Sequence, residues 1–198
     1  MGRLLSALPV GSVVKSTNTK YNGKVIRWIV GTQDTANGRT GLVTEKMITL
    51  KCFDAKEPSN TNGDRRSYGN NRYSQSNIDQ WLNSQAASWY SARHSYDAPP
   101  NNANVWSNYN EYDTEAGFLS NFEADFRKAI LDAVIRVAKN TVTDGGGYED
   151  ITRKVFLLSN TEVGLSNENS VAEGALWSYF SSAARRQCCL LYTSPSPR

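Results

Sequence analysis

The chain has 198 residues, 39% of them hydrophobic and 21% charged, with a net charge of +3, three cysteines and one histidine. These proportions are typical of a globular protein with one sizeable core, and they exclude a chain that its own charge keeps disordered. No apolar run approaches the roughly 20 residues of a membrane span, and the charge is too low for a nucleic-acid footprint.

The first fifty residues predict a small antiparallel meander. Residues 11–15 form a short strand candidate, and Asn22-Gly23 is a hairpin-turn dipeptide because both residues accept positive φ. Residues 24–30 are rich in β-branched and aromatic side chains, which favours a second strand. Asn37-Gly38 marks the next turn, and a further strand is expected to end in residues 47–50. No signal or anchor is expected before this meander, because Pro9 interrupts the short N-terminal apolar stretch.

The middle of the chain alternates polar loops with helices. Residues 54–73 are rich in Asn, Ser, Gly and Arg and predict a long loop. Ile78, Trp81 and Leu82 lie at i, i+3 and i+4, which predicts a helix over residues 76–83. Residues 91–116, with their consecutive prolines and several Asn and Tyr, predict a second long loop.

A long helix is predicted after that loop. Ser120 and Glu123 have the spacing of a capping box, and the apolar residues from Phe122 to Val137 keep helical spacing. The glycines of residues 144–147 then break the structure, and the apolar residues 154–159 predict a strand covered on both faces. A second capping box at Ser170 opens a predicted helix that reaches Phe180. The core expected from these elements contains Trp28, Trp81, Phe122, Phe126, Ile130, Val134 and Phe156.

The polar candidates for chemistry are weak. His94 lies in a polar loop, where a lone histidine is usually exposed, so neither a catalytic nor a metal role is expected for it. Asp54, Glu57 and Asp64 share a loop, and nothing in the pattern holds two carboxylates at a catalytic separation. The acidic residues between 144 and 150 lack the ligand spacing of an EF-hand, so a turn is favoured over a calcium site. We therefore predict no catalytic residue, no metal and no cofactor.

The remaining single residues fit structural roles. Cys52 follows an apolar stretch and has no histidine nearby in the sequence, which favours a buried thiol over a nucleophile. Arg65, Arg66 and Arg72, with neighbouring tyrosines, are too diluted by Asn and Ser to suggest nucleic acid as a partner.

Aromatic residues in and just before the second long loop are the better candidates for binding. Loops rich in Tyr, Trp, Asn and Ser have the composition of binding surfaces, in which rigid aromatics supply contact area. An equally good interpretation is that these side chains pin the loop to the core. The candidate ligand-binding residues are Trp89, Tyr90, Tyr96, Trp106, Tyr109 and Tyr112.

The last ten residues of the chain do not resemble the sequence before them. Residues 189–198 resemble the translation of a transposase-type sequencing adapter, and Cys188 lies at the junction. We therefore expect one domain over residues 1–187, truncated at its C-terminus, with residues 188–198 as an artefact, and we expect no regular structure in residues 189–198.

The order of the segments resembles a known family. The segment Ser-Asn-Ile-Asp-Gln-Trp-Leu-Asn at 76–83 and the segment Lys-Val-Phe-Leu-Leu-Ser at 154–159 together are similar to domain-of-unknown-function family 6273 of bacteria and phages. The resemblance spans roughly residues 9–180 and implies an α+β, C-type-lectin-like fold. Family members normally continue into a Trp-Trp-Leu-Arg-Ser-Pro run and a Gly-Val-Arg-Pro stretch, and this sequence has neither. The ligand surface of such folds usually lies in that later half.

The function expected from these observations is binding without catalysis. The loop composition and the lack of a catalytic pattern favour a recognition domain, and the resemblance implies a phage virion, tail or cell-surface context with a bacterial surface glycan or protein as partner. No nucleic acid and no membrane insertion are expected, and the location stays open between virion-associated and cytoplasmic. The alternatives are an enzyme resembling the formylglycine-generating branch of the fold, and a purely structural module.

Overall fold

The computed structural model describes residues 4–105, 111–167 and 170–190. The chain divides into two compact units. The sheet unit comprises Met1–Thr49, Leu158–Glu168 and Ala172–Arg198, and the loop unit comprises Leu50–Leu157 and Asn169–Val171. Each unit has buried apolar side chains of its own.

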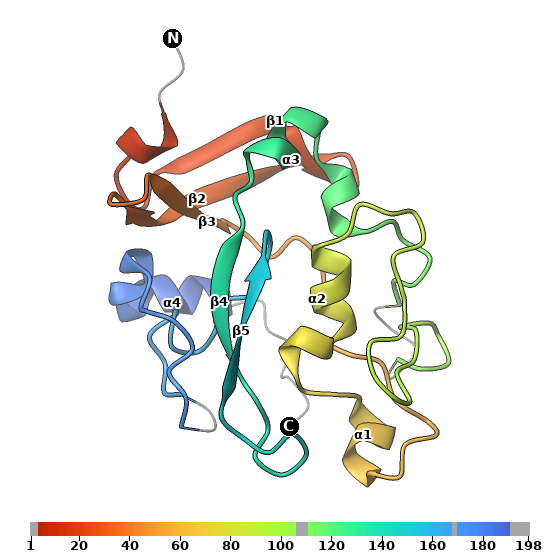
Figure 1. Cartoon of the computed structure of the whole chain (residues 1–198). Helices are drawn as coiled ribbons and strands as arrows, with labels where there is room; N and C mark the ends of the chain where they lie inside the picture. Colours follow the sequence, from red (N-terminus) through yellow and green to blue (C-terminus); the bar gives the residue numbers. More distant parts are fainter. Residues whose placement is uncertain (1–3, 106–110, 168–169, 191–198) are drawn as a thin grey trace. The chain divides into compact units, whose positions relative to one another are not determined.

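The sheet unit is built on the predicted antiparallel meander. Strands β1 (Val13–Tyr21), β2 (Lys24–Asp34) and β3 (Arg39–Thr44) pair in chain order, as Figure 1 shows in red and brown. Asn22 has φ of 48° and Gly23 has φ of 75°, so both central residues of the β1–β2 turn are left-handed and match the twist of the hairpin. The meander and the Asn22-Gly23 turn are therefore confirmed. The strand expected at 47–50 is wrong, since β3 ends at Thr44 and the chain then leaves the sheet.

Short helices complete the sheet unit: η1 (Leu5–Ala7), η5 (Ser178–Ser181) and α4 (Ala183–Leu190). Added Cβ atoms at Gly31 and Gly41 would lie 2.5 and 2.8 Å from the Trp177 ring, so both glycines let this indole approach the strands. The helix predicted from Ser170 to Phe180 is wrong. Ser170 has φ of 56°, whereas an N-cap residue needs an extended backbone. The backbone of Cys189 and Leu190 lies in α4, so the expectation of an irregular tail fails there, and residues 191–198 lie outside the described residues.

Helix α2 (Asn77–Leu82) is the centre of the loop unit. The Ser76 Oγ accepts a hydrogen bond from the Asp79 backbone N–H and caps the helix, which confirms the prediction for residues 76–83. Every residue of α2 is buried. The connections around it contain α1 (Gly63–Tyr68), η2 (Tyr73–Gln75) and η4 (Phe118–Asn121). Figure 1 shows α1 and α2 in yellow tones, within long irregular connections.

The long helix predicted over residues 122–137 is wrong. The chain forms a short helix, α3 (Ala124–Ala129), and then strand β4 (Ala133–Ala138), which pairs with β5 (Tyr148–Arg153) in an antiparallel hairpin. Val134, Ile135 and Val137 are β-branched and favour a strand. Val134 is 70% exposed, so the core predicted for that residue is also wrong.

The predicted strand at 154–159 is also absent, because β5 ends at Arg153 and the chain continues without strand pairing. Side-chain bonds replace the ladder there: Asn83 Oδ1 accepts from the backbone N–H groups of Lys154 and Val155, and Asn83 Nδ2 donates to the Val155 carbonyl.

The core of the loop unit is largely aromatic. Trp81 and Phe122 are buried as predicted, with Trp89, Tyr112 and Phe118 beside them, whereas Phe126 is only partly buried. Trp28 belongs to the sheet unit and is partly exposed, so the burial predicted for that residue is wrong.

The described chain is thus an α+β protein with antiparallel strands and short helices, which confirms the predicted class at that level. Within the described residues, no helix has the length and apolarity needed to cross a bilayer.

Candidate functional site

A buried polar cluster lies beside the N-terminal end of α2. It is formed by side chains from three separate segments: Asp54 and Glu57, then Asn70 and Asn77, then His94 and Asp97. Asp54, Glu57 and His94 each offer one atom that could bind a metal, a carboxylate oxygen or a ring nitrogen, and these three atoms all lie within 4.8 Å of one another. The structure therefore gathers three side chains for which the sequence predicted no chemical role.

Backbone contacts fix Asp54 at this position. Its Oδ2 accepts from the Asn70 N–H at 2.7 Å, and its Oδ1 accepts from the Asn77 N–H at 2.9 Å. The Asn77 Oδ1 in turn accepts from the Ala55 N–H at 2.9 Å, so the two chain segments hold each other. Gly69 permits this approach, because a Cβ there would lie 2.4 Å from the Ala55 carbonyl oxygen.

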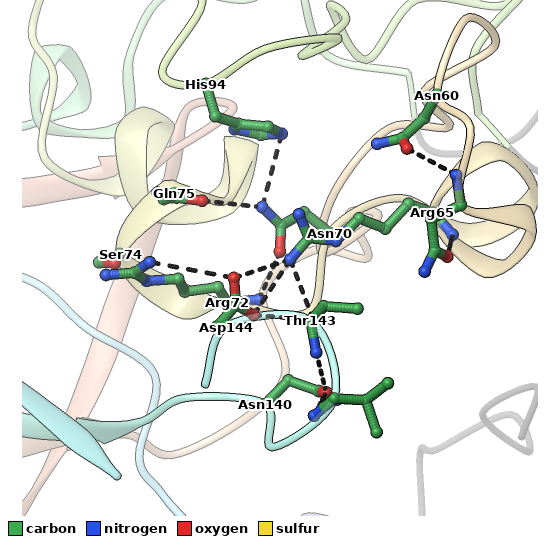
Figure 2. A network of polar contacts seen from close by, with 12 residues as sticks. Asn60, Arg65, Asn70, Arg72, Ser74, Gln75, His94, Asn140, Thr143 and Asp144 are labelled. Atoms are coloured by element: carbon green, nitrogen blue, oxygen red, sulfur yellow. Dashed lines mark hydrogen bonds and ion pairs between the residues drawn. The ribbon is translucent and has the colours of Figure 1, made fainter. Parts of the chain in front are cut away.

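His94 lies between two carboxylates. Its Nε2 is 2.6 Å from Glu57 Oε1, and its Nδ1 is 3.8 Å from Asp97 Oδ2. Only 10% of the His94 side chain is exposed, compared with 0% for Glu57 and 1% for Asp97. The expectation of an exposed loop histidine is therefore wrong. Asn70 Nδ2 lies 3.4 Å from the same Nε2 and donates to Gln75 Oε1, as Figure 2 shows.

Burial dominates the electrostatics of the polar cluster. Removal from water raises the pKa of Asp54 to about 8, although two backbone N–H groups oppose that shift and the charges of Asp97 and Glu57 add to it. A proton on Asp54, or a cation beside it, therefore offsets the cost of burying the charged carboxylate. The arrangement of two carboxylates and an imidazole also provides the oxygen and nitrogen donors that divalent metals bind in proteins.

Arginines occupy the acidic turn that the sequence raised as a possible calcium site. Asp144 accepts from Arg65 at 2.9 Å, and Glu149 accepts from Arg72 at 2.6 Å. Figure 2 shows Arg65 and Arg72 directed at Asp144, beside Asn70. Asp150 pairs instead with Arg136. The carboxylates of this turn thus tie the β4–β5 hairpin to the loops that follow Asn60.

An open polar cleft of about 250 Å³ lies elsewhere in the loop unit. Asp79 forms hydrogen bonds of 2.6–2.9 Å with Arg153, and Asp132 lies 3.1 Å from the Lys154 Nζ. Burial still raises the pKa of Asp79, so desolvation outweighs the attraction of the guanidinium. The cleft is lined by Asp79, Asn83, Arg93, Asp132, Thr152, Arg153 and Lys154.

The predicted aromatic ligand-binding residues do not share one environment. Trp89 and Tyr112 are buried and stack at 5.3 Å, which matches the interpretation that aromatics pin the loop to the core. Tyr90 is partly buried, and Tyr96 is 49% exposed with φ of 69°. Trp106 and Tyr109 lie outside the described residues.

Cys52 is a poor nucleophile here. Its side chain is partly buried, and burial raises the pKa of the thiol to about 12, so the thiolate is scarce at neutral pH. This agrees with the structural role predicted for it.

Comparison with known proteins places most of the chain in one family. No curated protein and no solved structure matches it. A family model described as a domain of unknown function, DUF6273, matches residues 37–191, which include all members of the polar cluster and of the cleft. The chain belongs to this family of domains of unknown function.

Proposed function

We propose that the chain is a non-catalytic binding domain and that the open polar cleft of the loop unit takes an acidic group of a bacterial surface glycan. The observation that carries this proposal is the state of the cations in the cleft. Arg153 and Lys154 form ion pairs with Asp79 and Asp132, whereas Arg93 forms no ion pair within 4 Å in the described part of the chain and acts on the Asp79 carboxylate only at longer range.

A backbone hydrogen bond fixes the position of Arg93. Its N–H donates to Asp97 Oδ2 at 2.7 Å, while the residue itself is exposed. A guanidinium offers a planar fork of donors that matches a carboxylate or a phosphate. Thr152 is exposed and lines the same cleft, and its hydroxyl is the kind of neutral donor and acceptor that sugars use.

The cleft suits binding better than turnover. Its two acidic side chains are paired with cations, so neither is free to act as a general base. A charged and open site of this kind gains affinity from hydrogen bonds and loses it as salt rises.

The finer assignments of fold and context form part of the same proposal. A C-type-lectin-like arrangement is supported by short antiparallel strands that carry long polar loops. A role on a phage tail or at a cell surface is supported by analogy with the family resemblance alone.

Binding to acidic wall polysaccharide, immobilised on a sensor surface, tests the function. We expect saturable binding to the wild-type chain, at least a tenfold weaker affinity for Arg93→Ala, and a smaller loss for Arg93→Lys. Arg39→Ala, an exposed arginine of the sheet unit, serves as the matched control and should bind as the wild type does. Equal binding by Arg93→Ala and the wild type, or chemical change of the glycan, would contradict the proposal.

A further inference from the structure

We propose that Asp54, Glu57 and His94 bind one divalent transition-metal cation inside the loop unit. The three side chains come from segments up to 40 residues apart, yet their ligand-type atoms lie within 4.8 Å of one another. One imidazole with two carboxylates is a donor set that suits Mn²⁺ and Zn²⁺. None of the three residues lines the glycan-binding cleft, so metal binding can be tested separately from glycan binding.

The unpartnered nitrogen of His94 is a second observation that points to a ligand. Nine-tenths of the His94 side chain is shielded from water. Its Nδ1 is buried and still has no hydrogen-bond partner in the described structure. An unsatisfied buried polar atom costs about 1–3 kcal/mol. Metal binding gives this atom a role: when Nε2 takes the cation, Nδ1 carries the proton and faces Asp97 Oδ2, 3.8 Å away. Metal-bound histidines usually donate their second N–H to a carboxylate, a backbone carbonyl or water, and a small rotation of the ring would bring Nδ1 within hydrogen-bond distance of Asp97.

The distances between the proposed ligand atoms allow a cation to bind with little movement of the side chains. His94 Nε2 and Glu57 Oε1 are 2.6 Å apart, and two ligand atoms on one tetrahedral zinc ion are roughly 3.3 Å apart. Each Asp54 oxygen accepts one backbone N–H and keeps a second lone pair for a cation.

Within the described residues, the carboxylates of the polar cluster also lack a cationic lysine or arginine partner. Asp54, Glu57 and Asp97 are buried carboxylates around one imidazole, and no lysine or arginine in the described chain forms an ion pair with any of them. Ionised together, the three carboxylates would carry more negative charge than one imidazole can offset in a medium of low dielectric constant. A divalent cation offsets that excess, and its competitor for the same oxygens is the proton.

Direct metal titration tests the inference. The purified chain, stripped with EDTA and dialysed, is titrated with Mn²⁺ while free Mn²⁺ is followed by electron paramagnetic resonance, and with Zn²⁺ by calorimetry. Mn²⁺ is the cleaner probe because it does not favour the thiolates of the three cysteines. We expect one Mn²⁺ per chain, removed by EDTA.

Isosteric variants identify the site. Glu57→Gln and His94→Asn should each weaken Mn²⁺ binding at least tenfold, and Asp97→Asn should weaken it about 10–100-fold as a residue that orients the imidazole. Glu123→Gln, an exposed glutamate of the same unit, is the matched control and should bind normally. Circular dichroism establishes that each variant is folded. Failure of the wild type to bind either metal, or unchanged binding by folded Glu57→Gln, would overturn the assignment.

Discussion

Two clusters hold the loop unit together by different physics. The aromatic cluster joins Trp81, Trp89, Tyr112, Phe118 and Phe122 through ring contacts of 5.1–5.6 Å. The polar cluster joins Asp54, Glu57, Asn70, Asn77, His94 and Asp97 through directional bonds and buried charge. The aromatic cluster is stabilised by area removed from water, whereas the polar cluster depends on hydrogen bonds that offset the cost of burying its polar groups.

The difference separates stability from function in this domain. Aromatic packing gains free energy without regard to pH or ions, and its few polar atoms reach backbone partners, as Trp81 Nε1 reaches the Ala116 carbonyl at 3.0 Å. The polar cluster accumulates negative charge that a purely structural network does not need. We therefore expect metal ions and pH to act on the polar cluster and to leave the aromatic cluster unchanged.

The largest loss of stability should follow removal of the central indole. Trp81 is 1% exposed and contacts both Tyr112 and Phe118, so Trp81→Ala should lower the free energy of unfolding by about 3–5 kcal/mol. Urea denaturation measures the change. Phe126→Ala should cost less because that ring is only partly buried, and equal losses for the two variants would contradict the assigned core.

A smaller loss should follow the removal of one polar partner. Asn77→Ala leaves the Ala55 N–H without its acceptor and Asp97 Oδ1 without the Asn77 donor, which should cost about 2–3 kcal/mol. Asn71→Ala, an exposed neighbour in the same loop, should be nearly neutral. Comparable urea midpoints for these two asparagine variants would show that the polar cluster does not stabilise the fold.

The Glu149–Arg72 pair should give a modest, pH-dependent effect. Hydrogen bonds from Arg72, aided by Ser74, lower the pKa of Glu149 below its ordinary value of 4.5. A lowered carboxyl pKa stabilises the fold above pH 4.5, and that stabilisation is lost as the pH falls through the folded-state value. Glu149→Gln should therefore cost about 1 kcal/mol at pH 7 and progressively less below pH 4.5.

The exposed Arg136–Asp150 pair of the same hairpin provides the control for that measurement. Asp150→Asn should cause no measurable change in the free energy of unfolding, because both side chains of the pair are more than 40% exposed. A pH-independent difference between Glu149→Gln and the wild type would contradict the assigned role of the Glu149 charge.

Local signals in the sequence predicted the parts of the fold that depend on local chemistry. The Asn22-Gly23 turn and the Ser76 cap follow from backbone preferences of single residues, and both are present. The helix prediction for the stretch from Phe122 to Val137 failed because two signals compete there. The apolar residues fit a helical period, whereas Val134, Ile135 and Val137 prefer a strand. Pairing with β5 decides in favour of the strand.

The polar cluster could not have been predicted from the sequence. Glu57 and His94 are 37 residues apart, and the contact between them depends on how two long loops pack. The only early signal was the concentration of Asp, Glu and Asn in the loop at 54–73, which is equally typical of a solvated turn. Burial, which no local pattern revealed, makes these residues a candidate site.

The nitrogen NMR spectrum of the imidazole tests the central claim most directly. His94 is the single histidine of the chain, so a ¹⁵N-histidine-labelled sample gives one pair of ring-nitrogen resonances. Without metal, we expect Nε2 to be bonded to Glu57; one equivalent of Zn²⁺ should then move the Nε2 resonance to that of a metal-bound nitrogen and leave the proton on Nδ1. Ring resonances that do not respond to Zn²⁺ would show that the buried charge of this cluster is balanced by protons alone.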